Sequence, residues 1–183
     1  MRKVIILGLK LFLLAAVAGL ALGLTNMVTS GAIAEQQVKA AEAARQAVLP
    51  SAEQFTELTA PQELKDAFAG YDASGKLAGK TGTIVTKGYG GEIEITVGVD
   101  NDGVITGISV GGSSFSETAG LGARAKEAWF AEQYIGKASP IALTKDGGEI
   151  DAITSATITS RAVTTAVNNA VLALGALTPP TEG

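Results

Sequence analysis

The longest apolar stretch of the chain lies near its start. Residues 11–34 carry no charged side chain, and a helix needs about 20 apolar residues to cross a bilayer. Lys10 would lie at the membrane boundary, where its long stem reaches water. Because basic residues favour the cytoplasmic side, the cluster of Arg2, Lys3 and Lys10 places the N-terminus in the cytoplasm. We predict a transmembrane anchor over residues 1–34, with the remainder on the other side of the membrane.

The same segment also has the features of a cleaved secretory signal peptide. Such peptides combine a basic start, a short apolar core and a small-residue cleavage site. Here the apolar core covers residues 11–24, and Ala32-Ile33-Ala34 is the small-residue signature. Both interpretations export the rest of the chain, so the sequence leaves both open.

A polar helix is expected to follow the apolar segment. Residues 35–49 are rich in Ala, Glu, Gln, Lys and Arg, which are good helix formers, and Pro50 stops the pattern. We assign residues 35–60 to a helical stalk or linker. The segment 61–178 is then a compact domain, and 179–183 a tail.

Alternating apolar and polar positions after residue 76 predict a β-meander. Every second residue from Ile93 to Val99 is Ile or Val, and the following Asp-Asn-Asp-Gly is typical of a turn. Further apolar positions at 84–85 and 104–110 extend the pattern to neighbouring strands. Weaker signals predict an earlier strand over residues 64–71 and a short one over residues 141–144.

Two later segments have the spacing of helices. Residues 123–135 carry Trp129, Phe130 and Tyr134 on one face, which we interpret as core because large apolar residues are mostly buried. The last helix has an apolar stripe from Val163 to Leu177 and ends before Pro179. The predicted fold class is therefore α+β, with an antiparallel sheet packed by helices.

Composition removes several kinds of chemistry. The chain has no Cys and no His, which excludes disulfides, thiolate metal sites, cysteine-held iron-sulfur clusters, His-ligated haem and a Ser-His-Asp triad. Its net charge of -4 gives no basic footprint for nucleic acid. We assign no catalytic acid or base and no metal site, so any redox chemistry would come from a cofactor.

A cluster of hydroxyls precedes the last helix. Five Ser or Thr side chains lie between Thr154 and Ser160. Such residues cap helices by accepting hydrogen bonds from the first amides. The same amides, with the positive end of the helix dipole, also bind phosphate, and the small Ala156 permits close approach. The residues alone leave capping and phosphate binding open.

This stretch resembles the flavinylation motif of the FMN-binding domain family. The motif is an Asp, two variable residues, Ser or Thr, a small residue, Ala-Thr, one more residue and a further Ser or Thr, and it matches residues 151–159. The resemblance implies that Thr157 is joined through its oxygen to the phosphate of FMN. Ser155 occupies a position that is often Gly in the family.

Two further stretches resemble the same family. Residues 116–122 resemble its Glu-Thr-Pro-Gly-Leu-Gly loop beside the flavin, with Ala119 in place of Pro. Residues 87–93 resemble its Gly-Tyr-Gly-Gly segment before a central strand. Together the matches cover about residues 79–169.

The resemblance implies a set of cofactor-binding residues around Thr157. Asp151 would be read by the attaching enzyme or assist the helix start through its charge. The other expected FMN-binding residues are Thr154, Ser155, Ala156, Ile158 and Thr159 near the phosphate, and Glu117, Thr118, Leu121 and Gly122 near the ring.

Within this family, the plan of one membrane helix, a stalk and one FMN domain is most similar to the G subunits of Rnf-type ion-translocating electron transport complexes. That similarity implies an electron-transfer subunit that meets other complex subunits, the lipid bilayer of the cell membrane, and a separate flavin transferase that uses FAD and a divalent ion. The C subunit of sodium-translocating NADH:quinone reductase and a stand-alone exported flavin carrier are alternatives. An exported binding domain without flavin is an alternative of another class.

Overall fold

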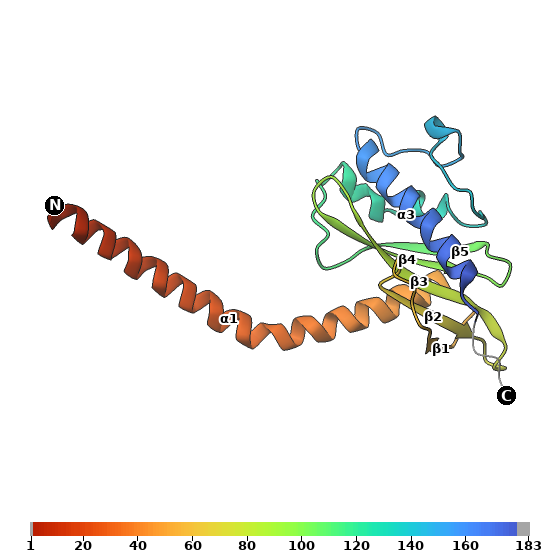
Figure 1. Ribbon diagram of the computed structural model, residues 1–183, viewed down its shortest axis with the longest axis horizontal. Helices are drawn as coiled ribbons and strands as arrows, with labels where there is room; N and C mark the ends of the chain where they lie inside the picture. The colour runs from red at the N-terminus through yellow and green to blue at the C-terminus, as the bar shows by residue number, and fades with distance from the viewer. Residues whose placement is uncertain (1, 179–183) are drawn as a thin grey trace. The chain divides into compact units, whose positions relative to one another are not determined.

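The structure is a computed structural model that describes residues 2–178 (Figure 1). It divides into two units, Met1–Ala41 and Glu42–Gly183, which are described separately. The tail expected over residues 179–183 lies outside the described residues.

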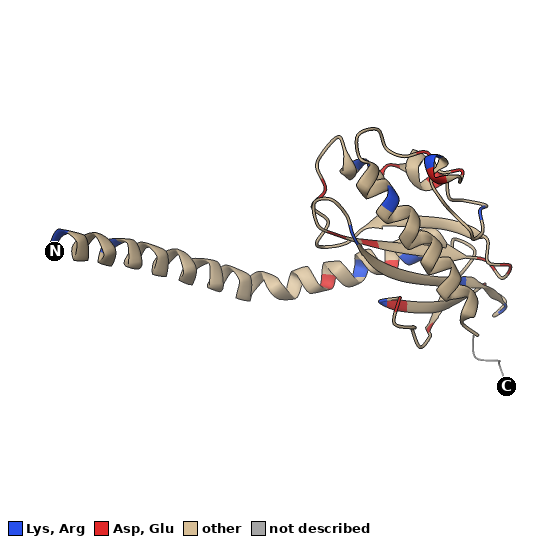
Figure 2. Cartoon of the chain, turned by 45° about the horizontal axis from the view of Figure 1, so that its top comes forward, with Lys and Arg blue, Asp and Glu red and all other residues tan. Residues whose placement is uncertain are grey.

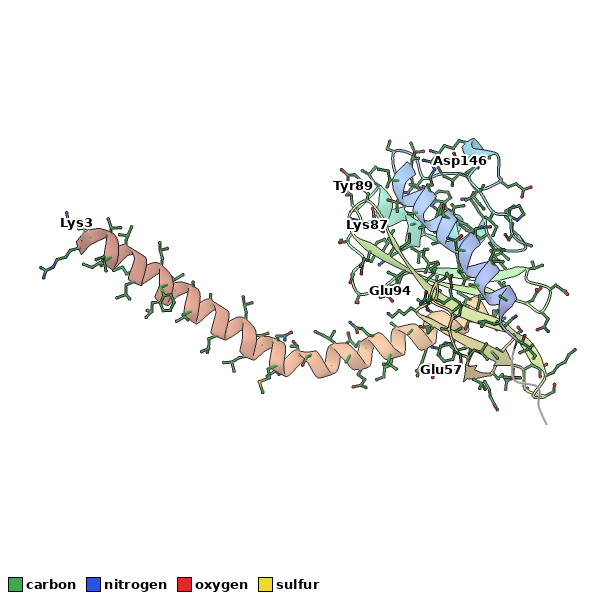
Figure 3. All side chains as sticks on the ribbon, in the orientation of Figure 1. Lys3, Glu57, Lys87, Tyr89, Glu94 and Asp146 are labelled. Carbon is green, nitrogen blue, oxygen red and sulfur yellow. The ribbon has the colours of Figure 1, made fainter. Side chains whose placement is uncertain are left out.

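The first unit is the main part of helix α1 (Arg2–Val48). Its side chains project on all sides and are exposed to their surroundings (Figure 3). The charged ones lie toward its two ends, leaving a long uncharged middle (Figure 2). This helix is long and apolar enough to cross a membrane, a property it shares with signal sequences.

The second unit contains a five-stranded antiparallel sheet in the order β1-β2-β3-β4-β5. Short turns connect β2 to β3, β3 to β4 and β4 to β5, and a longer segment, residues 58–65, connects β1 to β2. In the turn before β5, for example, the Asp100 carboxylate accepts hydrogen bonds from the amides of Asp102 and Val104, both at 2.9 Å. The strands are β1 (Gln54–Glu57), β2 (Asp66–Tyr71), β3 (Leu77–Lys87), β4 (Glu92–Val99) and β5 (Ile105–Gly111).

Helix α3 (Thr157–Ala176) covers one face of the sheet (Figure 1). Val163, Val167 and Leu174 of its stripe are fully buried, and Leu177 at the end of the stripe is partly buried. The alternating residues of β4 from Ile93 to Val99 meet this stripe with no exposed surface. The alternating residues of β4 and the helical stripe of α3 thus pack into one core, which confirms the α+β fold.

The opposite face of the sheet is covered by the end of α1 and the turn after it. Val48 and Leu49 are buried, and the Thr106 hydroxyl donates to the Val48 carbonyl at 2.5 Å. The compact unit therefore begins at Glu42, earlier than the boundary at residue 61 expected from sequence. Strand β1, within the expected linker, is part of the sheet.

The expected helix over residues 123–135 is broken into two short pieces. A 3₁₀ helix, η1 (Gly122–Lys126), and α2 (Ala128–Glu132) are separated by Glu127 in an extended conformation. Phe130 and Tyr134 are buried as expected, with edge-to-face rings, and the Tyr134 hydroxyl lies 2.7 Å from that of Thr164. Trp129 was expected in the core with them but is 37% exposed, because its indole N–H donates to the exposed Glu127 carboxylate.

The expected strand over residues 141–144 is also absent from the part of the chain that the structure describes. Leu143 makes a single parallel bridge to Ile150. The chain then forms a 3₁₀ turn, η2 (Thr144–Asp146), and Gly147 follows with a φ of 87°. Because this turn closes within a few residues, the segment stays too short to form a ladder.

Candidate functional site

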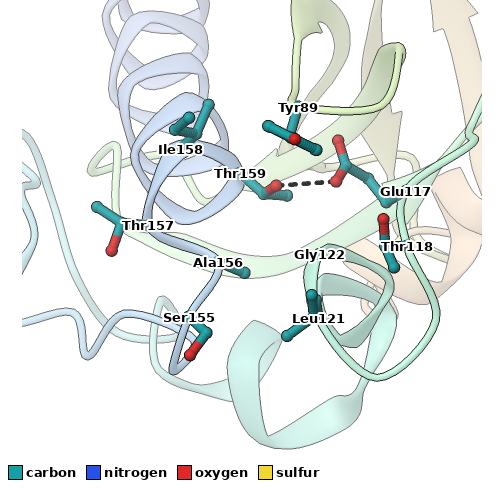
Figure 4. A pocket seen from close by; sticks show the side chains of 10 residues that line it. All are labelled: Tyr89, Glu117, Thr118, Leu121, Gly122, Ser155, Ala156, Thr157, Ile158 and Thr159. Carbon is teal, nitrogen blue, oxygen red and sulfur yellow. Dashed lines mark hydrogen bonds between the residues drawn. The ribbon is translucent and has the colours of Figure 1, made fainter.

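Three segments meet around a pocket of about 400 Å³ at the start of α3 (Figure 4). They are the turn between β3 and β4, the loop before η1, and the residues around the first turn of α3. The lining residues are Tyr89, Glu117, Thr118, Leu121, Gly122, Ser155, Ala156, Thr157, Ile158 and Thr159.

The pocket brings together all the residues expected to bind the cofactor except Asp151 and Thr154. It adds Tyr89, which belongs to the Gly-Tyr-Gly-Gly stretch but was not among the residues predicted to line the site. Tyr89 lies in the turn between β3 and β4 (Figure 3) and is 72% exposed. The sequence feature that could have identified Tyr89 as a pocket residue is a large aromatic side chain between glycines in a tight turn.

The hydroxyl cluster does not cap α3. Within residues 2–178, no side chain hydrogen-bonds at the N-cap position, Ala156. The Ser160 hydroxyl instead turns back, accepting from the Ile153 amide and donating to the Ala156 carbonyl, both at 2.9 Å. The earliest α3 amide with a backbone acceptor is that of Ser160, at 3.0 Å from the Ala156 oxygen. The preceding amides are therefore free to bind an anion.

Ser155 adopts a backbone conformation that favours glycine. Its φ is 63°, which is uncommon for a residue with a Cβ atom. This turns the chain sharply just before α3, so that Ser155 and Thr157 both line the pocket. The geometry explains why a glycine would suit this position.

Glu117 ties two walls of the pocket together. Its carboxylate accepts a hydrogen bond from the Gly90 amide at 3.0 Å and another from the Thr159 hydroxyl at 2.9 Å, the second of which Figure 4 shows. The turn between β3 and β4 is thereby linked to the first turn of α3. Glu117 thus acts as a structural bridge at the pocket floor.

Thr157 lies within reach of one positive charge. The Lys145 ammonium donates to the Thr157 hydroxyl oxygen at 2.8 Å. Lys145 belongs to η2, and it was not predicted from the sequence because it lies twelve positions before Thr157, with turn and loop between them. Nothing in that spacing indicates contact.

Asp151 and Thr154 lie outside the pocket lining. The Asp151 carboxylate accepts from the Thr144 hydroxyl at 2.9 Å, and its amide donates to the Gln133 side chain at 2.7 Å. The first turn of α3 contains no acidic residue. Asp151 thus precedes the first turn of α3, and both of its expected roles, recognition by an attaching enzyme and assistance to the helix start, stay predictions.

The pocket fits an anionic aromatic ligand. Three large apolar side chains on its walls are exposed, Tyr89 by 72%, Leu121 by 40% and Ile158 by 58%, and they offer surface to a planar ring. The free amides at the start of α3 and Lys145 offer donors to a phosphate. Over residues 2–178, no group of three or more Asp or Glu side chains is placed to hold a metal ion.

Comparison with known sequences agrees with this geometry. The profile of the FMN-binding domain family matches residues 88–172, a range that includes the whole pocket lining. The chain is 42% identical to the G subunit of the Na⁺-translocating ferredoxin:NAD⁺ oxidoreductase complex of Acetobacterium woodii, over 90% of this chain and 88% of the relative. It is 33% identical to the G subunit of the ion-translocating oxidoreductase complex of Methanosarcina acetivorans, over 86% and 87%.

A solved structure shares the fold. The crystal structure of the C subunit of the Na⁺-translocating NADH-quinone reductase from Parabacteroides distasonis superposes with a TM-score of 0.50 at 21% identity, covering 62% of this chain and 64% of that one. The sequence similarity to the G subunits extends over nearly the whole chain, whereas the similarity to this C subunit is one of fold. The chain belongs to the family of G subunits of ion-translocating oxidoreductase complexes and carries the FMN-binding domain.

Proposed function

We propose that this chain is the electron-carrying G subunit of an ion-translocating ferredoxin:NAD⁺ oxidoreductase complex, with FMN attached through its phosphate to Thr157. The observation that carries the proposal is the position of Thr157, on the pocket wall at the uncapped start of α3. The similarity to the Acetobacterium woodii protein over 90% of this chain supports the assignment to such a complex.

Different residues of the pocket would bind the phosphate and the ring of FMN. The amides at the start of α3 would bind the phosphate, and Leu121, Ile158 and Tyr89 would lie against the ring. When bound, FMN supplies the one- and two-electron chemistry that no side chain of this composition provides. A phosphoester at Thr157 would prevent loss of FMN from an exported domain that has no cytoplasmic pool to draw on.

The chain is a membrane protein whose relatives are subunits of multi-subunit complexes. We propose that residues 1–34 are retained as an anchor in the cell membrane, with the FMN domain on the extracytoplasmic side. A separate flavin transferase would attach FMN from FAD. Other subunits of the complex would donate and accept the electrons.

The attachment is tested by mass and fluorescence. The full chain produced together with a flavin transferase should gain the mass of FMN less water and give a fluorescent band on a denaturing gel. Thr157→Ala should abolish both signals, because it removes the only atom to which the phosphate is joined. The matched control is Thr165→Ala, the same change at an exposed position of the same helix.

The possible results separate the alternatives. A label that persists in Thr157→Ala would contradict attachment at this residue. A chain that never becomes fluorescent, even in its native form, would instead favour the exported binding domain without flavin. A labelled chain that purifies without other membrane subunits would favour the stand-alone flavin carrier.

A further inference from the structure

Three consecutive residues of η2 each contact a different residue in or beside the attachment segment. The Thr144 hydroxyl donates to the Asp151 carboxylate at 2.9 Å. The Lys145 ammonium donates to Thr157 at 2.8 Å. Asp146 accepts two hydrogen bonds from the Arg161 guanidinium, at 2.8 and 3.0 Å. The turn is therefore fixed on both sides of Lys145.

These flanking contacts matter because Lys145 is exposed. An exposed lysine on a free loop would lose side-chain entropy on holding one position, and its ion pairs would contribute little. Here the bidentate Asp146–Arg161 pair orders the backbone in advance. Hydrogen bonds from Arg161 also lower the pKa of Asp146 below its ordinary value.

We propose that η2 is a clamp that presents the Lys145 ammonium to the Thr157 oxygen, where it promotes covalent attachment of FMN and then pairs with the phosphodiester. The inference rests on the proposed function. An ammonium is a point-charge partner for phosphate. Its hydrogen bond to the hydroxyl oxygen stabilises the negative charge that appears there as the hydroxyl proton leaves.

The attachment step balances without any redox change. The bond between the Thr157 oxygen and the FMN phosphorus forms as the pyrophosphate bond of FAD breaks. The hydroxyl proton leaves to solvent, and AMP departs with the bonding electron pair. The oxygen of Thr157 has two lone pairs, so it can accept from Lys145 and still attack phosphorus.

The rate of attachment tests the clamp. The full chain, isolated in detergent without flavin, is mixed with purified transferase, FAD and a divalent ion, and fluorescent label is followed over time. Lys145→Gln should slow labelling by about tenfold, as expected for loss of an exposed charged hydrogen bond that the flanking contacts hold in place. The control is Lys76→Gln, an equal change of charge in the exposed turn between β2 and β3, which should label at the normal rate.

The absence of cysteine in the chain allows the charge to be restored chemically. Lys145→Cys would carry the only thiol. Alkylation with bromoethylamine rebuilds an ammonium on a chain of lysine length, while iodoacetamide gives a neutral adduct. The ammonium adduct should label several-fold faster than the neutral one, and the difference should shrink as salt is raised, because screening weakens exposed charges.

Each result has one meaning. Equal rates for the native chain and Lys145→Gln, or for the two alkylated forms, would overturn the clamp while leaving FMN attachment intact. No label on the native chain would overturn the proposed function itself. A slower rate in Lys145→Gln with unchanged thermal unfolding, recovered by the ammonium adduct, would establish the role of the charge.

Discussion

At the scale of single residues, the Glu117 carboxylate fits between two walls of the pocket because Gly88 and Gly122 have no side chains. A Cβ atom on Gly122 would lie 2.1 Å from one Glu117 oxygen, and a Cβ on Gly88 would lie 2.2 Å from the other. Both distances are far below van der Waals contact. These two glycines are therefore needed for Glu117 to reach Thr159 and the turn before β4.

We expect Glu117→Ala to lower the free energy of unfolding by about 1 to 2 kcal/mol, because two hydrogen bonds to a half-buried carboxylate are lost. Gly122→Ala should reproduce this effect by displacing the carboxylate. In the flavin-labelled chain, both changes should also make the flavin more accessible to quenching by iodide. Denaturant unfolding and quenching measure the two effects.

The matched control for this prediction is Glu132→Ala, which removes an exposed carboxylate and should change the unfolding free energy by less than about 0.5 kcal/mol. If Glu117→Ala and Glu132→Ala proved equally stable, the bridge between the two pocket walls would contribute nothing.

At the scale of elements, the end of α1 lies on the sheet because two paired glycines leave room for it. Gly98 of β4 faces Gly107 of β5 in register. A Cβ on Gly98 would lie 2.3 Å from the Val48 carbonyl oxygen. The obstructing atom belongs to the backbone, so it cannot move aside as a flexible side chain can.

Gly98→Ala should therefore destabilise the domain by about 2 to 3 kcal/mol, the upper part of the range for overpacking. Gly111→Ala on β5 is the control, because its nearest neighbour would be the Lys126 side chain at 4.0 Å. It should unfold within about 0.5 kcal/mol of the native chain. Similar denaturation midpoints for the two variants would show that α1 does not need this space.

The elements predicted well from sequence are those with a long regular period. The alternation from Ile93 to Val99 gave β4 close to its observed bounds. The stripe from Val163 identified α3 and its end, but the helix begins at Thr157, within the hydroxyl cluster that was expected to precede it. The segment 123–135 failed because Ala125 and Phe130 are both buried, although on one straight helix they would point about 140° apart. The break at Glu127 lets both reach the core, a requirement that only the packed sheet imposes.

The candidate site also combines residues that local sequence patterns predict with residues that only the folded structure brings together. The residues of the pocket near Thr157 and the loop from Glu117 could be named from local motifs, which are short in sequence. Lys145 could not, because its contact with Thr157 depends on how η2 folds back. Strand β1 was missed for a similar reason, since its side chains are largely exposed and leave no alternating pattern.

At the scale of the whole molecule, the chain joins an apolar segment to a domain that carries a redox pocket. If FMN and its transferase act outside the cytoplasm, the domain must lie on that side. The basic residues Arg2, Lys3 and Lys10 favour this orientation. The basic residues near the N-terminus thereby determine on which side of the membrane FMN would be attached.

The orientation can be measured with single cysteines, since the chain has none of its own. Ser74→Cys lies in the exposed turn between β2 and β3 and should react with a membrane-impermeant maleimide in intact spheroplasts. Ser30→Cys, within the uncharged stretch, should stay unlabelled, because a thiol in lipid does not ionise. Labelling of Ser74→Cys only after permeabilisation would reverse the orientation. An intact mass that lacks residue 30 would instead identify the segment as a cleaved signal peptide, with the domain still exported.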